Sequence, residues 1–353
     1  MKTVQLLLKN GFGITEKSKD RFFQVHPKQM IGLALSDFCS HKCWYCCNGK
    51  PYNGKKTGII DSLGVEKYSK CILKMSNENI VEYRIYGNEP TEHPNFKDLV
   101  KVILDNGHFL TILTNGTNSD VIESSFSGFS KEYISRVKME MSFHLGVYAK
   151  DSSDIRLKKY FNVHFPKALL YCKSIVLIIP LSPNILVFDS FIKNVNILIE
   201  MANSANVDMQ IIPTEFYGSF FKKQYPKDYS DGEKKVIQNI MEKYNYEKVF
   251  SKFDKNSVSD LCKMNKGLYL KGMPCYFVNN FLRISSSGDV SCCGSGIPNK
   301  IIGEITDNIL LPKKYEPFPC PYDVCVCPLH GTRGCLDPNE VSYSDYFLEL
   351  NKL

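Results

Sequence analysis

The chain has 353 residues, of which 43% are hydrophobic and 23% charged, and its formal net charge is +7. This balance is typical of a soluble globular protein. No uncharged apolar run approaches the ~20 residues that a membrane helix needs, and the N-terminus lacks the features of a signal peptide. The lysines are scattered in pairs near acidic residues, with no arginine and aromatic stripe, so we expect neither a membrane nor a nucleic acid as a partner.

The chain contains 14 cysteines and no secretion signal. In a reducing cytosol, clustered cysteines bind metal or react more often than they form disulfides. We therefore expect a cytoplasmic protein with metal-binding cysteines. Cys71 and Cys172 are exceptions, because their apolar helical contexts predict packed core thiols.

Short apolar and β-branched runs predict six strands, at 31–35, 81–86, 109–114, 137–143, 174–179 and 207–212. Stretches with helical spacing lie at 61–75, 95–105, 186–201 and 232–244. Strands that alternate with helices predict parallel βαβ units and hence an α/β fold. After about residue 250 the chain becomes rich in Cys, Gly and Pro, which predicts a small domain held by metal. The expected boundaries are an N-terminal extension over 1–30, an α/β domain over 31–245 and a cysteine-rich domain over 246–353.

The distinctive polar residues come directly after the predicted strands. Cys39 follows the first strand, and a GNEP turn begins at Gly87 after the second. Asn115 follows the third strand and His144 closes the fourth. The carboxyl ends of parallel strands carry the active site in α/β barrels, so we expect a single site built from these residues.

The segment SDFCSHKCWYCCNG at 36–49 places Cys39, Cys43 and Cys46 in the spacing C-x3-C-x2-C, with Cys47 beside the last. Zinc, a disulfide and an iron–sulfur cluster all compete for such a group. A structural zinc needs four ligands, often as two C-x2-C pairs, and no second pair lies nearby. Three thiolates on a short loop suit three corners of a [4Fe–4S] cluster, whose fourth iron stays open to an exchangeable ligand.

This spacing, followed by GNEPTEHP at 87–94 and LTNGT at 113–117, resembles the signature of the radical S-adenosylmethionine (SAM) enzymes. The resemblance implies a partial (β/α)6 TIM-like barrel in which the three cysteines of the spacing bind the cluster. It also implies residues that bind SAM, namely Tyr45, Gly87, Asn88, Glu89, Pro90, Asn115 and Ser142. Asn88 replaces the second glycine of the family's GGEP-like turn, so the turn keeps its function only if asparagine tolerates that conformation. A zinc or adventitious cysteine site on an ordinary α/β domain is the alternative.

The resemblance also implies the reaction. A reductant such as flavodoxin or ferredoxin reduces the cluster, and SAM is reductively cleaved to methionine and a 5′-deoxyadenosyl radical. That radical abstracts a hydrogen atom from the substrate, as in an oxidoreductase or maturase. The cofactors carry this chemistry, while the protein excludes water and aims one C–H bond at the radical.

The passages RISSSGDVSCCG at 283–294 and IIGEITDN at 301–308 resemble the SPASM/Twitch extension of radical SAM enzymes, which carries auxiliary iron–sulfur clusters. The resemblance implies one or two such clusters, with ligands among Cys275, Cys293, Cys320, Cys325, Cys327 and Cys335, and with Cys292 as the alternative to its neighbour. The later cysteines have the spacing C-x4-C-x-C-x7-C, where the extension has C-x2-C-x5-C-x3-C. The number of clusters and their ligands therefore stay open, and a zinc ribbon is the alternative.

Three further residues are candidates for catalysis, each with a structural alternative. His144 is a candidate acid or base, or a histidine of the core. Glu215 follows the sixth strand and is a candidate contact for adenosine or substrate, or a surface acid. Cys262 is a candidate hydrogen-atom donor, or a structural thiol.

The motifs define the chemistry and leave the substrate open. Many radical SAM enzymes oxidise, crosslink or epimerise peptides or proteins, and we favour that class slightly. Only 38 residues precede Cys39, too few for a leader-binding domain, so a separate protein supplies recognition or the substrate is small. A radical SAM dehydrogenase or epimerase of a sugar or aminocyclitol is the alternative. A non-catalytic iron–sulfur electron-transfer protein is another, but such a carrier has no use for the SAM-binding GNEP turn.

Overall fold

The computed structural model describes residues 30–41, 43, 46, 57–76, 79–144, 159–181, 193, 196–197, 200, 208–213, 229–243, 274–275, 281–291, 301–305 and 318–319. In this described part, no helix has the length and the apolar character needed to span a membrane.

Six parallel strands follow one another in chain order across the sheet. They are β1 (Met30–Ala34), β2 (Glu82–Tyr86), β3 (Phe109–Thr114), β4 (Val137–Ser142), β5 (Ser174–Leu181) and β6 (Asp208–Pro213). Each lies within two residues of its predicted position. The α/β fold with a parallel sheet is therefore confirmed, and it is consistent with a partial TIM-like barrel. The carboxyl ends of the six strands share one edge, as expected for parallel pairing.

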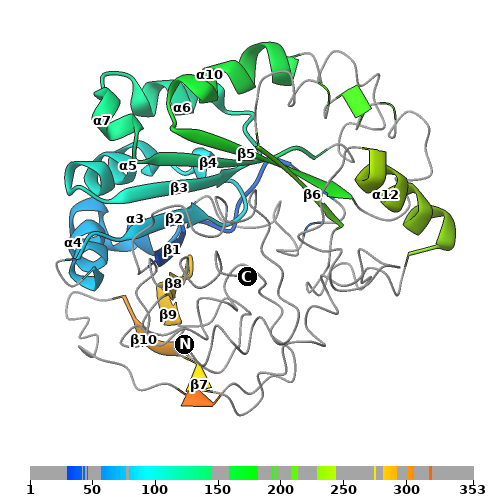
Figure 1. Ribbon diagram of the computed structural model, residues 1–353. Helices are drawn as coiled ribbons and strands as arrows, with labels where there is room; N and C mark the ends of the chain where they lie inside the picture. Colours follow the sequence, from blue (N-terminus) through cyan, green and yellow to red (C-terminus); the bar gives the residue numbers. More distant parts are fainter. Residues whose placement is uncertain are drawn as a thin grey trace, which may run out of the picture.

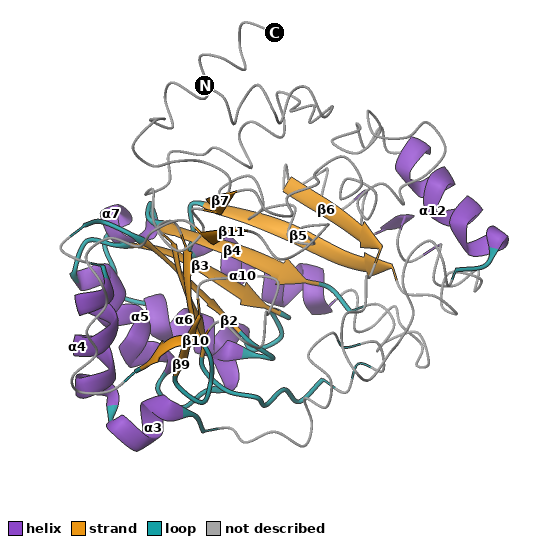
Figure 2. Ribbon diagram, turned by 90° about the horizontal axis from the view of Figure 1, so that it is seen from below, coloured by secondary structure: helices purple, strands orange, loops and turns teal. Residues whose placement is uncertain are grey.

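Helices connect these strands and cover one face of the sheet (Figures 1 and 2). They are α3 (Ile59–Leu63), α4 (Val65–Met75), α5 (Phe96–Asp105), α6 (Ser119–Phe126), α7 (Lys131–Ile134) and α10 (Phe165–Leu170), with a 3-10 turn η2 (Pro90–Glu92) and a π-helical turn η3 (Tyr160–His164). A further helix, α12 (Asp231–Lys243), follows β6. The helix predicted at 61–75 is two helices, because Gly64 interrupts it. Of the helix predicted at 186–201, only four positions lie in the described part, and all four are helical.

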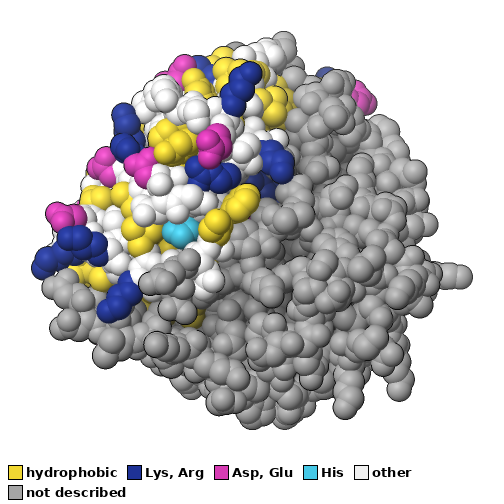
Figure 3. Space-filling view, turned by 60° about the vertical axis from the view of Figure 1, so that its left-hand side comes forward, with side chains coloured by type: hydrophobic (Ala, Val, Ile, Leu, Met, Phe, Trp, Pro, Cys, Tyr) yellow, Lys and Arg dark blue, Asp and Glu magenta, His cyan; other side chains and the backbone are white. Residues whose placement is uncertain are grey.

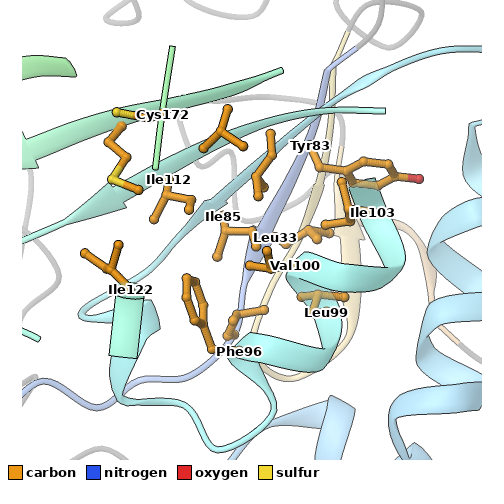
Figure 4. Close-up of a cluster of buried hydrophobic side chains, with 14 of the residues drawn as sticks. Leu33, Tyr83, Ile85, Phe96, Leu99, Val100, Ile103, Ile112, Ile122 and Cys172 are labelled. Carbon is orange, nitrogen blue, oxygen red and sulfur yellow. The ribbon is translucent and has the colours of Figure 1, made fainter. Parts of the chain in front are cut away.

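The core lies between the sheet and these helices. Figure 4 shows α5 side chains, among them Leu99 and Ile103, against Leu33, Tyr83 and Ile85 of the sheet. All five are fully buried, and each buried side chain of this size contributes about 1.5–3 kcal/mol relative to leaving it exposed. The two thiols predicted for the core, Cys71 and Cys172, are also buried in this cluster and form no disulfide within the described residues. Figure 4 shows Cys172.

The opposite face of the sheet carries charged side chains. Arg84 of β2 forms an ion pair with Glu140 of β4, and Lys138 approaches the same carboxylate at 3.4 Å. The Arg283 guanidinium lies 5.6 Å from the centre of the Tyr86 ring on the neighbouring part of the sheet. A polar face of this kind is expected for the interior of an open barrel that receives polar ligands.

Strands from the cysteine-rich segment extend the same sheet beyond β1. Strand β8 (Phe281–Ile284) pairs with β1 in parallel, and β9 (Asp289–Ser291) and β10 (Ile301–Glu304) continue it in antiparallel fashion. The sheet thus has nine described strands, in the order β10-β9-β8-β1-β2-β3-β4-β5-β6. A separate two-stranded pair joins β7 (Pro274–Cys275) to β11 (Phe318–Pro319). The domain boundary near residue 246 stays a prediction.

The described helical surface carries charges of both signs (Figure 3). Lys70 pairs with Glu66 at 2.6 Å on α4, and Lys101 pairs with Asp105 at 2.5 Å on α5. Such exposed pairs contribute little to stability, because water and salt screen them. Their arrangement agrees with the solvated surface that the scattered lysines predict.

Candidate active site

Segments that follow β1, β2 and β3 meet at the carboxyl edge of the sheet. The Glu89 backbone amide, after β2, donates to the Phe38 carbonyl, after β1, at 3.1 Å. The Glu89 carboxylate accepts from the Asn115 amide, after β3, at 2.6 Å. The sequence predicted that these strand ends form one site, and the described residues here are in direct contact.

The cysteine loop, which we define as residues 36–58, carries the three thiols of the C-x3-C-x2-C spacing. Cys39 and Cys43 are buried, Cys46 is half-buried, and none of the three forms a disulfide within the described residues. The Cys46 amide donates to the Cys43 carbonyl at 3.1 Å, which forms a tight turn between the last two. Within the described residues, no three Cys, His, Asp or Glu side chains converge on a single metal ion. A [4Fe–4S] cluster requires no such convergence, because each thiolate binds a different iron.

Acidic groups surround Cys39. Burial, together with the nearby carboxylates of Glu89 and Glu92, raises the pKa of its thiol to about 12. The free thiol is therefore neutral at pH 7, and it becomes a thiolate ligand only when a metal centre supplies positive charge. Thiols on an acid-lined loop fit a cationic iron cluster better than a disulfide.

Glu92 ties the turn after β2 to the cysteine loop. Its carboxylate accepts from the Ser40 hydroxyl at 2.5 Å and from the Ser40 amide at 3.2 Å. Ser40 directly follows Cys39, so this contact fixes the backbone beside the first thiol. Sequence reasoning quoted Glu92 within GNEPTEHP and assigned it no role. The sequence around Glu92, two residues beyond Pro90, does not predict this contact, because its partner Ser40 lies 52 positions away.

The GNEP turn adopts the backbone that a glycine pair would provide. Gly87 has φ +91°, and a Cβ there would lie 3.1 Å from the Ala34 Cβ. Asn88 has φ +41° and is the one described non-glycine residue in the left-handed region. Asparagine is among the few residues that adopt this region readily. The departure from the family's second glycine therefore leaves the backbone shape intact.

Glu89 is fully buried, and its carboxylate joins the GNEP turn to the end of β3 through hydrogen bonds. Its carboxylate accepts from the Thr91 hydroxyl and the Thr114 hydroxyl, each at 2.6 Å, in addition to the amides of Thr91 and Asn115. Burial raises the pKa of Glu89, and these four donors oppose that shift. Four donors and no acceptor fit the ionised carboxylate, so we assign Glu89 as an anion at neutral pH.

Two side-chain amides present buried atoms with no hydrogen-bond partner in the described structure. They are the Oδ1 atom of Asn88 and the Nδ2 atom of Asn115. The orientation of Asn115 is fixed, because its Oδ1 accepts from the Thr117 amide and hydroxyl at 2.9 and 2.7 Å. One orphan acceptor and one orphan donor, at neighbouring strand ends, suit a ligand with both an ammonium and a carboxylate group.

Histidines from two strand ends face each other beside the thiols. His144 follows β4, and its ring meets the ring of His41 edge to face, with centroids 6.0 Å apart. Burial lowers the pKa of His144 to about 3, and the neighbouring His41 adds to this effect. His144 is therefore a neutral ring at pH 7, which packs against the cysteine loop. Ser142 ends β4 two residues earlier and is half-buried. Sequence reasoning missed His41.

Several predicted site residues lie outside the described residues. They are Tyr45, Glu215, Cys262, Cys292, Cys293, Cys320, Cys325, Cys327 and Cys335. Cys275 lies in β7, where its backbone is opposite Phe318 of β11. The roles predicted for all of these residues stay predictions.

The Radical SAM superfamily model matches residues 33–169 of this chain. The matched segment begins in β1, ends in α10, and includes the cysteine loop, the GNEP turn and Asn115. Residues 33–169 are therefore similar to the radical SAM superfamily. This family implies a [4Fe–4S] cluster and SAM as cofactors, and its members are enzymes.

Solved structures are similar to this chain at low identity. Streptococcus suis SuiB bound to S-adenosylmethionine has 15% identity and a TM-score of 0.48, and SuiB bound to the precursor peptide SuiA has 14% and 0.49. The matches cover 80% and 84% of this chain, and this chain spans 64% of the length of each SuiB chain. The anSMEcpe structure with bound AdoMet and the Cp18Cys peptide has 15% identity and a TM-score of 0.44, covering 80% of this chain and 78% of that one. No curated protein sequence matches significantly.

The described residues fit the cofactors that the family implies. Three thiols on one loop, none of them in a disulfide within the described residues, would hold a cluster with one open iron. The orphan amide atoms of Asn88 and Asn115 lie where the GNEP turn and the third strand end. They match the ammonium and carboxylate of the methionyl part of SAM.

Proposed function

We propose that this chain is a radical SAM enzyme that modifies a peptide or protein by oxidation, crosslinking or epimerisation. Cys39, Cys43 and Cys46 hold the [4Fe–4S] cluster. The GNEP turn and Asn115 hold the methionyl group of SAM, with Ser142 and Tyr45 as further contacts. When bound, the reduced cluster and SAM supply hydrogen-atom abstraction from an unactivated C–H bond.

One observation carries this proposal. The cysteine loop and the GNEP turn are joined by the hydrogen bond from the Glu89 amide to the Phe38 carbonyl and by the Ser40–Glu92 pair. In the proposed enzyme, SAM binds to the open iron of the cluster. The cluster must therefore lie beside the groups that hold SAM. A zinc site on an ordinary α/β domain would have no need for a buried turn with orphan amides against its ligand loop.

The C-terminal cysteines are the proposed ligands of one or two auxiliary clusters. Strand β9 ends at Ser291, directly before Cys292 and Cys293 in the sequence. Cys275 pairs across β7 and β11 with Phe318, two positions before Cys320. Together with Cys325, Cys327 and Cys335, these thiols form a second ligand group, for which a zinc ribbon remains the alternative.

The substrate class is the finer part of the proposal. Many radical SAM enzymes modify peptides, and a sugar or aminocyclitol is the competing class. A reductant such as flavodoxin or ferredoxin supplies the electron, and the described cysteines, which form no disulfide, favour a reducing, cytoplasmic setting. Assay of 5′-deoxyadenosine formation with candidate peptides and candidate sugars distinguishes the two classes.

Iron content and EPR spectra of anaerobically reconstituted protein test the chemistry. We expect about 8 iron atoms or more per chain and about 4 fewer in the variant Cys39→Ala/Cys43→Ala/Cys46→Ala, because each cube holds four irons. Addition of SAM should change the EPR signal of the wild type alone. The double variant Cys71→Ala/Cys172→Ala removes two buried thiols away from the loop, and it should retain the wild-type iron content.

Zinc in place of iron would contradict the proposal, and so would a cluster signal that does not respond to SAM. Iron that stays with the triple variant at the wild-type level would place the cluster elsewhere. About 4 irons in the wild type would retain the radical SAM proposal and remove the auxiliary clusters.

A further inference from the structure

The hairpin turn between β8 and β9 lies against the cysteine loop, although it comes from the other end of the chain. The hydroxyl of Ser286 donates to the Asp37 carboxylate at 2.7 Å, across 249 positions of sequence. The carbonyl of Ser286 accepts from the Ile59 amide at 2.8 Å. Asp37 lies just before the first thiol, and Ile59 lies just after the loop ends. A single residue thus contacts both stems of the cysteine loop.

The turn that carries Ser286 is rigid in itself. The Ser285 amide donates to the Asp289 carbonyl at 2.9 Å, and the Asp289 amide donates to the Ser285 hydroxyl at 3.0 Å. The Ser287 hydroxyl donates to the Asp289 carboxylate at 2.7 Å. The hydroxyls of Ser285 and Ser287 therefore bond within the turn. Ser286 is the serine of this turn whose hydroxyl bonds to the cysteine loop.

The parallel pairing of β8 with β1 fixes where the turn lies. Leu33 lies opposite Ile284, so β8 ends beside the point at which β1 leads into the cysteine loop. Gly288 packs against α3 at the far stem, since a Cβ there would lie 2.8 Å from the Ile59 Cγ1 atom. The position of Ser286 therefore follows from the main sheet and from α3, and not from a free surface contact.

We propose that Ser286 is a positioning residue for the cysteine loop, which closes the loop at its two stems and so holds the three thiols in the arrangement that binds the cluster and SAM. This inference rests on the proposed function for its chemical meaning. It gives the C-terminal segment a role in the radical site that is independent of any auxiliary cluster.

A matched pair of serine variants tests this role. Ser286→Ala removes the contact with Asp37, whereas Ser287→Ala removes a hydroxyl of the same turn that contacts only the turn. We expect the SAM concentration that half-saturates the EPR change to rise about three- to tenfold in Ser286→Ala and to stay unchanged in Ser287→Ala. Asp37→Ala should match Ser286→Ala, and the double variant should be no worse than either single variant.

A second measurement decides the inference without any cofactor. In the metal-free protein, alkylation of the buried Cys39 and Cys43 thiols requires the loop to open. We expect the alkylation rate to rise about three- to tenfold in Ser286→Ala relative to Ser287→Ala. Equal rates and equal SAM responses in the two serine variants would overturn the positioning role. A wild type whose EPR signal ignores SAM, with faster alkylation in Ser286→Ala, would retain the closing contact and reject the radical SAM function.

Discussion

At the scale of single residues, one buried carboxylate organises the candidate site. Glu89 gathers donors from its own turn and from the end of β3, and its amide reaches the cysteine loop. Each hydrogen bond to a charged group of this kind is worth about 1.5–3 kcal/mol when both partners are buried. The shape of the site is therefore set by this carboxylate and the donors around it.

The backbone at Asn88 provides the first prediction. Asn88→Val places a β-branched residue at φ +41°, where such residues are strained, and should lower the free energy of unfolding by about 1–2 kcal/mol. Asn88→Gly removes the orphan Oδ1 atom without strain, so its stability should stay within about 1 kcal/mol of the wild type. Urea denaturation measures both, and equal losses would show that the side chain, not the backbone, decides stability.

A buried histidine away from the site provides a second prediction. The Nδ1 atom of His108 accepts from the Val81 amide at 3.4 Å, and burial, with the nearby Arg136, lowers the pKa of His108. The unfolded chain therefore binds the proton first, so this stabilisation is complete above pH 6.5 and is lost as the pH falls below it. The free energy of unfolding should fall between pH 7.5 and pH 5 in both proteins. The fall should be larger in the wild type than in His108→Gln, by up to about 2 kcal/mol. A parallel fall in the two proteins would assign the acid sensitivity to other groups.

At the scale of elements, the β8–β9 hairpin is joined to α3 by close packing. Gly288 and Gly128 have nearly the same backbone, with φ +96° and +91°, yet their surroundings differ. A Cβ at Gly288 would meet Ile59 at 2.8 Å and Ile305 at 3.0 Å, whereas a Cβ at Gly128 would meet nothing within 4 Å.

This pair separates steric contact from backbone strain. Gly128→Ala should cost about 1–2 kcal/mol of unfolding free energy, from the positive φ alone. Gly288→Ala should cost that amount plus about 1–3 kcal/mol, because the added methyl group displaces the hairpin from α3. Thermal and urea denaturation measure the free energy of unfolding of the two variants. If Gly288→Ala loses no more than Gly128→Ala, the hairpin shifts away from α3 without an energetic cost.

Elements with strong local patterns were predictable from sequence, and those that depend on distant partners were not. The strands of the parallel sheet have short apolar and β-branched runs, and β2 and β4 alternate apolar with charged residues, as expected for strands with one face on the core. Strand β8 has four residues, and its pairing with β1 and β9 defines it. The contact of the three strand ends followed from parallel topology. The Ser286–Asp37 and Ser40–Glu92 contacts did not, because no local pattern links residues so far apart.

At the scale of the whole molecule, β1 lies inside the sheet. One neighbour is the next strand along the chain, and the other comes from the cysteine-rich segment. All five residues of β1 are buried, with β2 on one side and β8 on the other. Removal of β8 would turn β1 into an edge strand with an apolar surface and unpaired backbone groups, which favours aggregation.

A fragment that ends at residue 245 tests this dependence. We expect it to aggregate or to melt without cooperativity, whereas co-expression of residues 246–353 should restore a soluble complex. Size-exclusion chromatography and circular dichroism measure the two outcomes against the full chain. A monomeric fragment with a cooperative melt would mean that the first six strands fold without the hairpin.

The long separation between Asp37 and Ser286 has a consequence for biosynthesis. A ribosome that adds about 5–20 residues per second needs roughly 12–50 s to reach Ser286 after it has made Asp37. During that time the nascent chain carries its first three thiols on a loop that lacks the contacts with Ser286. Delivery of iron and sulfide before translation ends would meet a loop without these contacts, so the timing of cluster insertion relative to translation becomes part of how this protein matures.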